Sequence, residues 1–183
     1  MSTQLSCIIN VNSGDKDFGF IYTMDSESIE NTIGSLLRRH KLWLAVAESC
    51  TGGLIGHRIT NIPGSSDYFL GGVIAYANQV KLQQLGVLLA TLEKHGAVSR
   101  ETVIEMARGV RQRLGADIGL SVSGIAGPGG GTAEKPVGLT WISLSSAGYE
   151  AAWSNLWQGS RTQIKAQAAE QALRLLHEYL QGL

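Results

Sequence analysis

Residues 42–53, LWLAVAESCTGG, decide how this sequence folds. The run 42–47 is apolar and uncharged, and its length suits one strand that is buried on both faces. Two glycines follow, and a helix with Leu54, Ile55 and Ile59 on its inner face is expected to begin at Gly53. The stretch therefore predicts a strand–turn–helix unit whose turn, ESCTGG, lies at the carboxyl end of a buried strand.

Similar apolar runs alternate with helical periodicity through the first two thirds of the chain. A first helix is expected to be capped by Asp25 or Ser26, and Ser160 with Gln163 forms a capping-box pattern before the last helix. The alternation predicts an α/β fold in three layers, α/β/α, with a central mixed, mostly parallel sheet. The expected strands are 42–47, 71–76, 118–124, 138–146 and 149–157, of which the last two form a hairpin.

The length of 183 residues fits one domain, which we place at 25–183. Residues 1–24 are aperiodic and are expected to form a poorly ordered tail, so that Met24 is an alternative start. The 15 basic and 15 acidic side chains cancel, which argues against a nucleic-acid partner. The sequence has no apolar run of about 18 residues and no signal-peptide pattern, so we expect no membrane partner and a cytoplasmic location.

The turn ESCTGG contains two candidate nucleophiles. Ser49 can attack a carbonyl carbon while N–H groups of Thr51, Gly52 or Gly53 hold the oxyanion. Cys50 is the rival, because a thiol at a helix N-terminus can have a lowered pKa. The local sequence is equally compatible with a helix cap that carries no chemistry. Cys7 and Cys50 make no disulfide framework, and no residue spacing indicates a metal site.

A serine nucleophile needs a base, and none of the four histidines lies in a motif. The stretch YANQVK places Tyr76 at a strand end and Lys81 in the first turn of a helix. Burial and the positive helix end both disfavour a charged lysine. A neutral Lys81 can then take the serine proton, directly or through the Tyr76 hydroxyl. The alternative is an exposed lysine beside a half-buried tyrosine.

The segment 124–136, GIAGPGGGTAEKP, contains five glycines and is expected to be a loop. Consecutive N–H groups in such a loop can bind an anion, and Thr132, Lys135 and Arg161 can add phosphate contacts. The alternative is a mobile surface loop without a ligand.

Four segments together resemble the CinA C-terminal domain family, over residues 27–181: AESCTGG, IPGSSDYFLGGVIAYAN, HGAVSRETVIEMA and SGIAGPGGGTAEKPVG. The resemblance implies nicotinamide-nucleotide amidase activity, which releases ammonia from nicotinamide mononucleotide without a metal or other cofactor. It also implies a homodimer. The rival function is a nucleotide-binding or regulatory module without turnover.

The resemblance assigns the catalytic roles to Ser49, Tyr76 and Lys81. The residues expected to bind the substrate or its oxyanion are Glu48, Thr51, Gly52, Asn78, Ser123, Gly124, Gly127, Gly130, Gly131, Thr132, Lys135 and Arg161. Two positions depart from the family pattern: Ala77 stands where serine is frequent, and Ser160 stands in the place of the aspartate of a G-D-R motif. Both departures are expected to affect affinity or substrate preference.

Overall fold

The computed structural model describes residues 28–183. The expected tail 1–24, the alternative start at Met24 and the caps Asp25 and Ser26 lie outside the described residues. The first helix, α1 (Ile29–His40), is capped by Ser28, whose hydroxyl accepts a hydrogen bond from the N–H of Asn31 at 3.3 Å. The expected cap at Asp25 or Ser26 is therefore wrong.

Five strands form one sheet in the order β2-β1-β3-β4-β5. Strand β1 pairs in parallel with β2 and β3, whereas β3–β4 and β4–β5 are antiparallel pairs. The mixed sheet is confirmed, but "mostly parallel" is not exact, because only two of the four pairings are parallel. The glycine-rich loop carries no crossover helix, so the chain returns from β3 into an antiparallel neighbour. The strand bounds are Leu44–Glu48 (β1), Phe69–Ile74 (β2), Ile118–Gly124 (β3), Leu139–Ser146 (β4) and Tyr149–Leu156 (β5).

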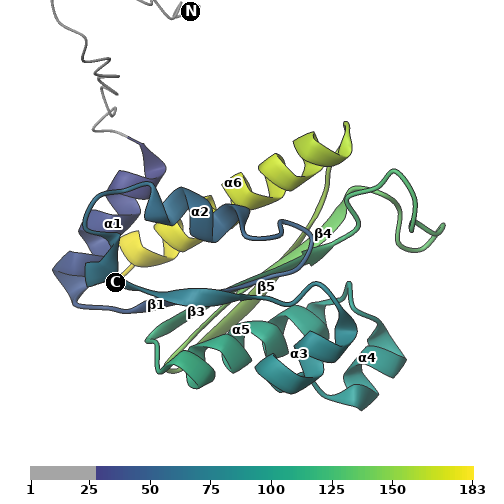
Figure 1. Cartoon of the computed structure of the whole chain (residues 1–183), viewed down its shortest axis with the longest axis horizontal. Helices are drawn as coiled ribbons and strands as arrows, with labels where there is room; N and C mark the ends of the chain where they lie inside the picture. The colour runs from purple at the N-terminus through teal and green to yellow at the C-terminus, as the bar shows by residue number, and fades with distance from the viewer. Residues whose placement is uncertain (1–27) are drawn as a thin grey trace, which may run out of the picture.

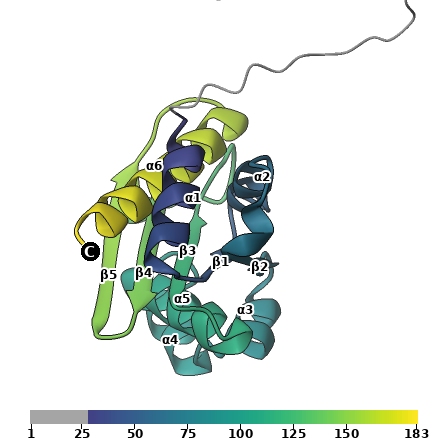
Figure 2. The same cartoon turned by 90° about the vertical axis from the view of Figure 1, so that its left-hand side faces the viewer.

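Helices cover both faces of the sheet, as predicted (Figures 1 and 2). One layer contains α1, α2 (Leu54–Thr60) and α6 (Arg161–Gln181), and the other contains α3 (Asn78–Leu85), α4 (Leu89–His95) and α5 (Arg100–Leu114). A short 3-10 helix, Ser65–Asp67, precedes β2. Helix α4 was not predicted, since this short helix has no capping side chain of its own and buries only Leu92.

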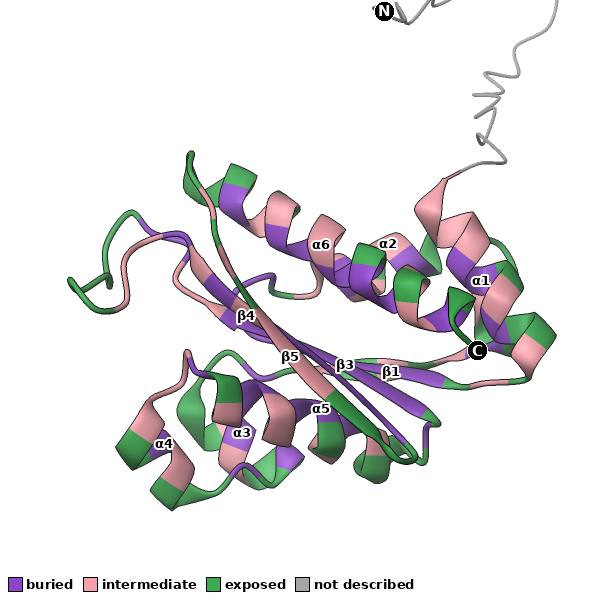
Figure 3. Ribbon diagram, turned by 180° about the vertical axis from the view of Figure 1, so that it is seen from behind, coloured by how far each residue is buried: buried purple, intermediate pink, exposed green. Residues whose placement is uncertain are grey.

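The two faces of β1 carry side chains of different size, and all of its residues are buried (Figure 3). Leu44 and Val46 pack into the core cluster that includes residues of α1 and α6. Ala45 and Ala47 pack into a smaller cluster with Met106 of α5. Small residues on the second face bring α5 close to the sheet, as the bond from the Ser121 hydroxyl to the Val103 carbonyl shows (2.6 Å).

Gly109 of α5 lies against the backbone of α3. A Cβ added there would lie 1.8 Å from the carbonyl oxygen of Leu85 in α3. Alanine normally stabilises a helix interior by about 1 kcal/mol relative to glycine. Overpacking against backbone costs about 1–3 kcal/mol or more. We expect Gly109→Ala to lower the free energy of unfolding, measured by urea denaturation, by about 1–3 kcal/mol.

Gly129 offers the matched control, because its added Cβ meets no heavy atom within 4 Å and its φ is not in the left-handed region. Gly129→Ala should change the free energy of unfolding by less than about 0.5 kcal/mol. Equal stability of the two variants would contradict the close helix crossing.

Candidate active site

Ser49 lies in the turn between β1 and α2, at the carboxyl end of β1. Its side chain and backbone are 8% exposed. The N–H of Ser49 donates to the carbonyl of Val122 in β3 at 3.0 Å, which extends the parallel pairing one residue beyond the strand. Its hydroxyl oxygen accepts a hydrogen bond from Lys81 Nζ at 3.1 Å. The serine is therefore fixed between the sheet and a lysine from α3.

Lys81 is buried, with an exposed fraction of 1%, so the alternative of an exposed lysine is wrong. Its Nζ also donates to the carbonyl of Ala75 at 2.7 Å. None of the ion pairs among residues 28–183 includes Lys81. Burial lowers the pKa of Lys81 below its ordinary value of 10.5, and the nearby Cys50 opposes this shift. The structure thus places an amine of weakened proton affinity against the Ser49 hydroxyl.

Tyr76 lies just beyond the end of β2 and is 59% exposed. Its hydroxyl accepts a hydrogen bond from Arg161 Nη2 at 2.6 Å. Among the hydrogen bonds of residues 28–183, none joins this hydroxyl to Ser49 or Lys81. The direct contact between Lys81 and Ser49 is therefore present, and the indirect one through the Tyr76 hydroxyl is not.

A cavity of about 230 Å³ opens beside these three side chains. It also receives the predicted residues Asn78, Ser123, Gly124 and Arg161. Ala97 and Val98, from the connection between α4 and α5, were missed because apolar residues in an unassigned segment carry no chemical signal. The complete lining is Ser49, Cys50, Tyr76, Asn78, Lys81, Ala97, Val98, Ser123, Gly124, Ala126 and Arg161.

Arg161 connects three segments at the rim of this cavity. Besides Tyr76, its guanidinium donates through Nη1 to the carbonyl of Gly127 at 2.8 Å. The preceding Ser160 forms the predicted capping box with Gln163 at the start of α6. Ala77 is the N-cap position of α3 and makes no side-chain cap bond. Both departures from the family pattern thus fall at helix N-termini rather than on the Ser49–Lys81 contact.

The glycine-rich loop does not bring its other predicted residues to the cavity. Five of them are absent from its lining: Gly127, Gly130, Gly131, Thr132 and Lys135. Lys135 Nζ instead donates to the carbonyl of His95 at the end of α4. The Thr132 hydroxyl accepts the N–H of Lys135 at 3.0 Å, so the loop closes on itself. These contacts explain why the expected phosphate cradle does not face Ser49.

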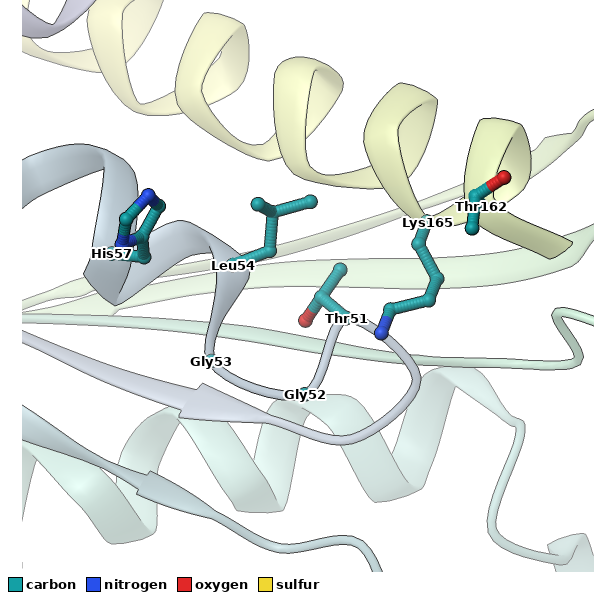
Figure 4. Close-up of a pocket in the computed structure, with 7 residues that line it drawn as sticks. All are labelled: Thr51, Gly52, Gly53, Leu54, His57, Thr162 and Lys165. Atoms are coloured by element: carbon teal, nitrogen blue, oxygen red, sulfur yellow. The ribbon is translucent and has the colours of Figure 1, made fainter.

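Three further residues expected to bind the substrate or its oxyanion do not line the cavity: Glu48, Thr51 and Gly52. The Glu48 carboxylate is buried, does not line the cavity, and accepts hydrogen bonds from the turn and from α2. Thr51 and Gly52 line a second, open hollow of about 390 Å³, whose lining shares no residue with that of the cavity. Figure 4 shows Lys165 extending from α6 toward this turn, with Thr162 and His57 also lining the hollow.

Cys50 lines the cavity but is chemically unlike the expected thiolate. Burial is the largest cause that raises the pKa of its thiol from 9.0 to about 11, and the Glu48 charge adds to the shift. Hydrogen bonds from N–H groups of the turn act in the opposite direction but are outweighed. A lowered pKa at a helix N-terminus is therefore wrong for Cys50, because desolvation dominates.

In the described part of the chain, no three His, Cys, Asp or Glu side chains are grouped so that they could hold a metal ion. The same residues include no helix with the length and apolar character needed to cross a membrane.

Known proteins match most of this chain. Residues 26–180 match the family model of the CinA C-terminal domain. A protein of Halothermothrix orenii, described as competence-damage inducible, is 54% identical over 162 residues, which cover 88% of this chain and 39% of the relative. A similarly described protein of Moorella thermoacetica is 46% identical over 97% of this chain and 43% of its own length. The chain thus spans about two fifths of these relatives.

Solved structures agree with the fold. The crystal structure of a CinA superfamily protein from Klebsiella pneumoniae 700603 superimposes with a TM-score of 0.82 at 30% identity, covering 85% of this chain and 97% of that one. A competence/damage inducible protein from Agrobacterium tumefaciens gives a TM-score of 0.75 at 39% identity, with 82% and 96% coverage.

The lowered pKa of Lys81 has a consequence for stability. Consider the pH range between the pKa of Lys81 in the folded chain and its ordinary value of 10.5. In this range the unfolded chain keeps a proton on Lys81 that the folded chain has released. The free energy of unfolding therefore rises with pH through this range. Lys81→Met removes the titrating group. We expect the stability of the wild type relative to Lys81→Met to increase as the pH rises toward 10.5. Urea denaturation of both proteins across this window measures the effect, and parallel pH profiles would contradict the burial of an uncompensated amine.

Proposed function

Since the chain belongs to the CinA C-terminal domain family, we propose that it is an amidohydrolase that converts nicotinamide mononucleotide to nicotinate mononucleotide and ammonia. The observation that carries the proposal is the hydrogen bond of 3.1 Å between the buried amine of Lys81 and the hydroxyl of Ser49, beside an open cavity. A neutral amine next to a serine hydroxyl is a nucleophile with its base. The identity of the substrate comes from the family resemblance.

The reaction begins when Ser49 Oγ attacks the carboxamide carbon and Lys81 accepts the hydroxyl proton. Collapse of the tetrahedral intermediate breaks the C–N bond, and Lys81 delivers the proton to the departing ammonia. Water then hydrolyses the acyl-enzyme, with Lys81 again as base. The lowered pKa of Lys81 enlarges the neutral fraction of the amine that can start the reaction.

The turn after Ser49 supplies candidate donors for the oxyanion. The N–H of Gly52 donates within the turn to the Ser49 carbonyl at 3.2 Å, and that of Gly53 donates to Glu48 at 2.9 Å. The N–H groups of Cys50 and Thr51 form hydrogen bonds to the Cys50 sulfur. Cys50 lines the cavity, so these N–H groups lie beside it. We therefore assign the oxyanion to the N–H groups of Cys50 and Thr51 rather than to that of Gly52.

Arg161 is the cation that lines the cavity at its rim. The ion pairs among residues 28–183 include no carboxylate partner for it. We assign the phosphate of the nucleotide to this guanidinium, which keeps its contacts to Tyr76 and Gly127 while it binds an anion through its remaining N–H groups.

The first test is ammonia release from nicotinamide mononucleotide by the wild type, Ser49→Ala and Cys50→Ala, without added metal. We expect Ser49→Ala to lose at least about 10³-fold in kcat, since the nucleophile is removed. Cys50→Ala should retain most of the activity, because its thiol is protonated at neutral pH. A silent wild type that still binds the nucleotide would favour the binding module without turnover.

A second test concerns the phosphate contact. Arg161→Met should raise KM for the mononucleotide about tenfold or more, because a charge-assisted hydrogen bond is lost. KM for nicotinamide riboside, which lacks the phosphate, should change much less. Arg174→Met is the matched control, since Arg174 pairs with Glu170 on the exposed face of the same helix. An equal rise in KM for both substrates would contradict the assignment.

A further inference from the structure

Glu48 is a buried acid immediately before the nucleophile. It is the last residue of β1 and is 1% exposed. One carboxylate oxygen accepts hydrogen bonds from the Thr51 hydroxyl at 2.7 Å, the Gly53 N–H at 2.9 Å and the Ile55 N–H at 3.1 Å. The other oxygen accepts the Gly56 N–H at 2.8 Å. Four donors thus satisfy a charge that would otherwise be costly to bury.

These hydrogen bonds give α2 the cap that its own sequence lacks. The N-cap residue of α2 is Gly53, which has a φ of 97° and no side chain. A helix of seven residues is marginal without tertiary support, and its first N–H groups need acceptors. Glu48 supplies them from the end of the strand, five to eight residues upstream. The cap is therefore separated from the helix by the turn that contains Ser49.

The same contacts close the turn 49–52 at both ends. Its first end is the backbone of Glu48, and its second end, Gly53, is bound to the Glu48 carboxylate. Thr51, inside the turn, is bound to the same oxygen. A movement of Glu48 would therefore shift Ser49 relative to Lys81 and would reorient the N–H groups of Cys50 and Thr51.

We propose that Glu48 is a positioning residue for the reaction of Ser49, and that it acts through the turn without touching the substrate. This inference rests on the proposed function. It replaces the substrate-binding role expected from the sequence, since the Glu48 side chain does not line the cavity.

The charge of Glu48 has a second effect that also favours Ser49 as the nucleophile. It adds to burial in raising the pKa of the Cys50 thiol. The carboxylate thus holds the turn in place and keeps the neighbouring thiol protonated, which leaves Ser49 as the nucleophile.

The test is Glu48→Gln in the full chain, with Glu105→Gln as the matched control. Glutamine keeps the shape of the side chain, but its amide NH₂ cannot accept the N–H groups that a carboxylate oxygen accepts. Glu105 is a partly buried carboxylate outside the cavity lining, and it likewise accepts hydrogen bonds at a helix start: from the Leu88 N–H at 2.8 Å and from the Thr91 hydroxyl at 2.7 Å, at the start of α4. Both variants are expected to fold, by circular dichroism, with a lower melting temperature.

For Glu48→Gln we expect kcat for ammonia release to fall about 100-fold while KM changes less than about threefold, because a misplaced nucleophile slows chemistry rather than binding. Glu105→Gln should leave kcat within about twofold of the wild type. A kcat within twofold of the wild type in Glu48→Gln, or a change mainly in KM, would overturn the positioning role.

A readout independent of amidase activity is the alkylation of Cys50 by iodoacetamide, followed by mass spectrometry across a pH series. Loss of the Glu48 charge and of its hold on the turn should move the pH midpoint of alkylation down and should speed the reaction. Glu105→Gln should match the wild type. If the wild type releases no ammonia, the proposed function fails, whereas an unchanged alkylation profile in Glu48→Gln overturns the role of Glu48 separately.

Discussion

The burial of the Lys81 amine, which has no ion-pair partner among residues 28–183, is the constraint on which the site depends. A charged lysine in this position would lose its hydration. Among residues 28–183, its nitrogen lies 2.7 Å from the Ala75 carbonyl and 3.1 Å from the Ser49 hydroxyl, with the Tyr76 carbonyl further away at 3.5 Å. The protein therefore holds the amine in a place where burial lowers its pKa, so that losing the proton costs less than it does for a lysine in water. The property that costs stability at neutral pH is the one on which the proposed role of Lys81 as a base depends.

That arrangement works only if the two acceptors are fixed relative to one another, and the parallel half of the sheet provides this. The N–H of Ala75 donates to the Glu48 carbonyl at 2.7 Å, and the N–H of Ser49 donates to the Val122 carbonyl at 3.0 Å. Pairing of β1 with both neighbours thus continues one step beyond the strand ends, into the site. The antiparallel strands β4 and β5 contribute no residue to the cavity lining, so the error about the proportion of parallel pairs did not affect the prediction of the site.

The parts of the structure that the sequence predicts are those with a local signal. The buried run before ESCTGG, the capping box at Ser160 and the hairpin near Gly148 each depend on residues that are close in the chain. Helix α4 lacks such a signal, and so do Ala97 and Val98 at the cavity. The direction of the glycine-rich loop depends on Lys135 reaching the end of α4, a contact across 40 residues. The place of the Glu48 side chain outside the cavity lining could not be predicted, because three of its four hydrogen-bond donors are backbone N–H groups, which no residue type in the sequence reveals.

The choice between the adjacent side chains Ser49 and Cys50 follows from where charge must form. A thiol is the stronger intrinsic nucleophile, but only as a thiolate, and at Cys50 burial and the Glu48 charge both oppose that anion. A serine hydroxyl stays neutral until it reacts, so it carries no charge that the apolar surroundings would penalise. When its proton passes to Lys81, the new positive charge arises 3.1 Å from Ser49 Oγ. The oxyanion forms on the carbonyl oxygen of the substrate, two covalent bonds from Oγ, and the two opposite charges stabilise each other in a site of low dielectric constant. The environment that suppresses Cys50 therefore strengthens the step that we propose for Ser49.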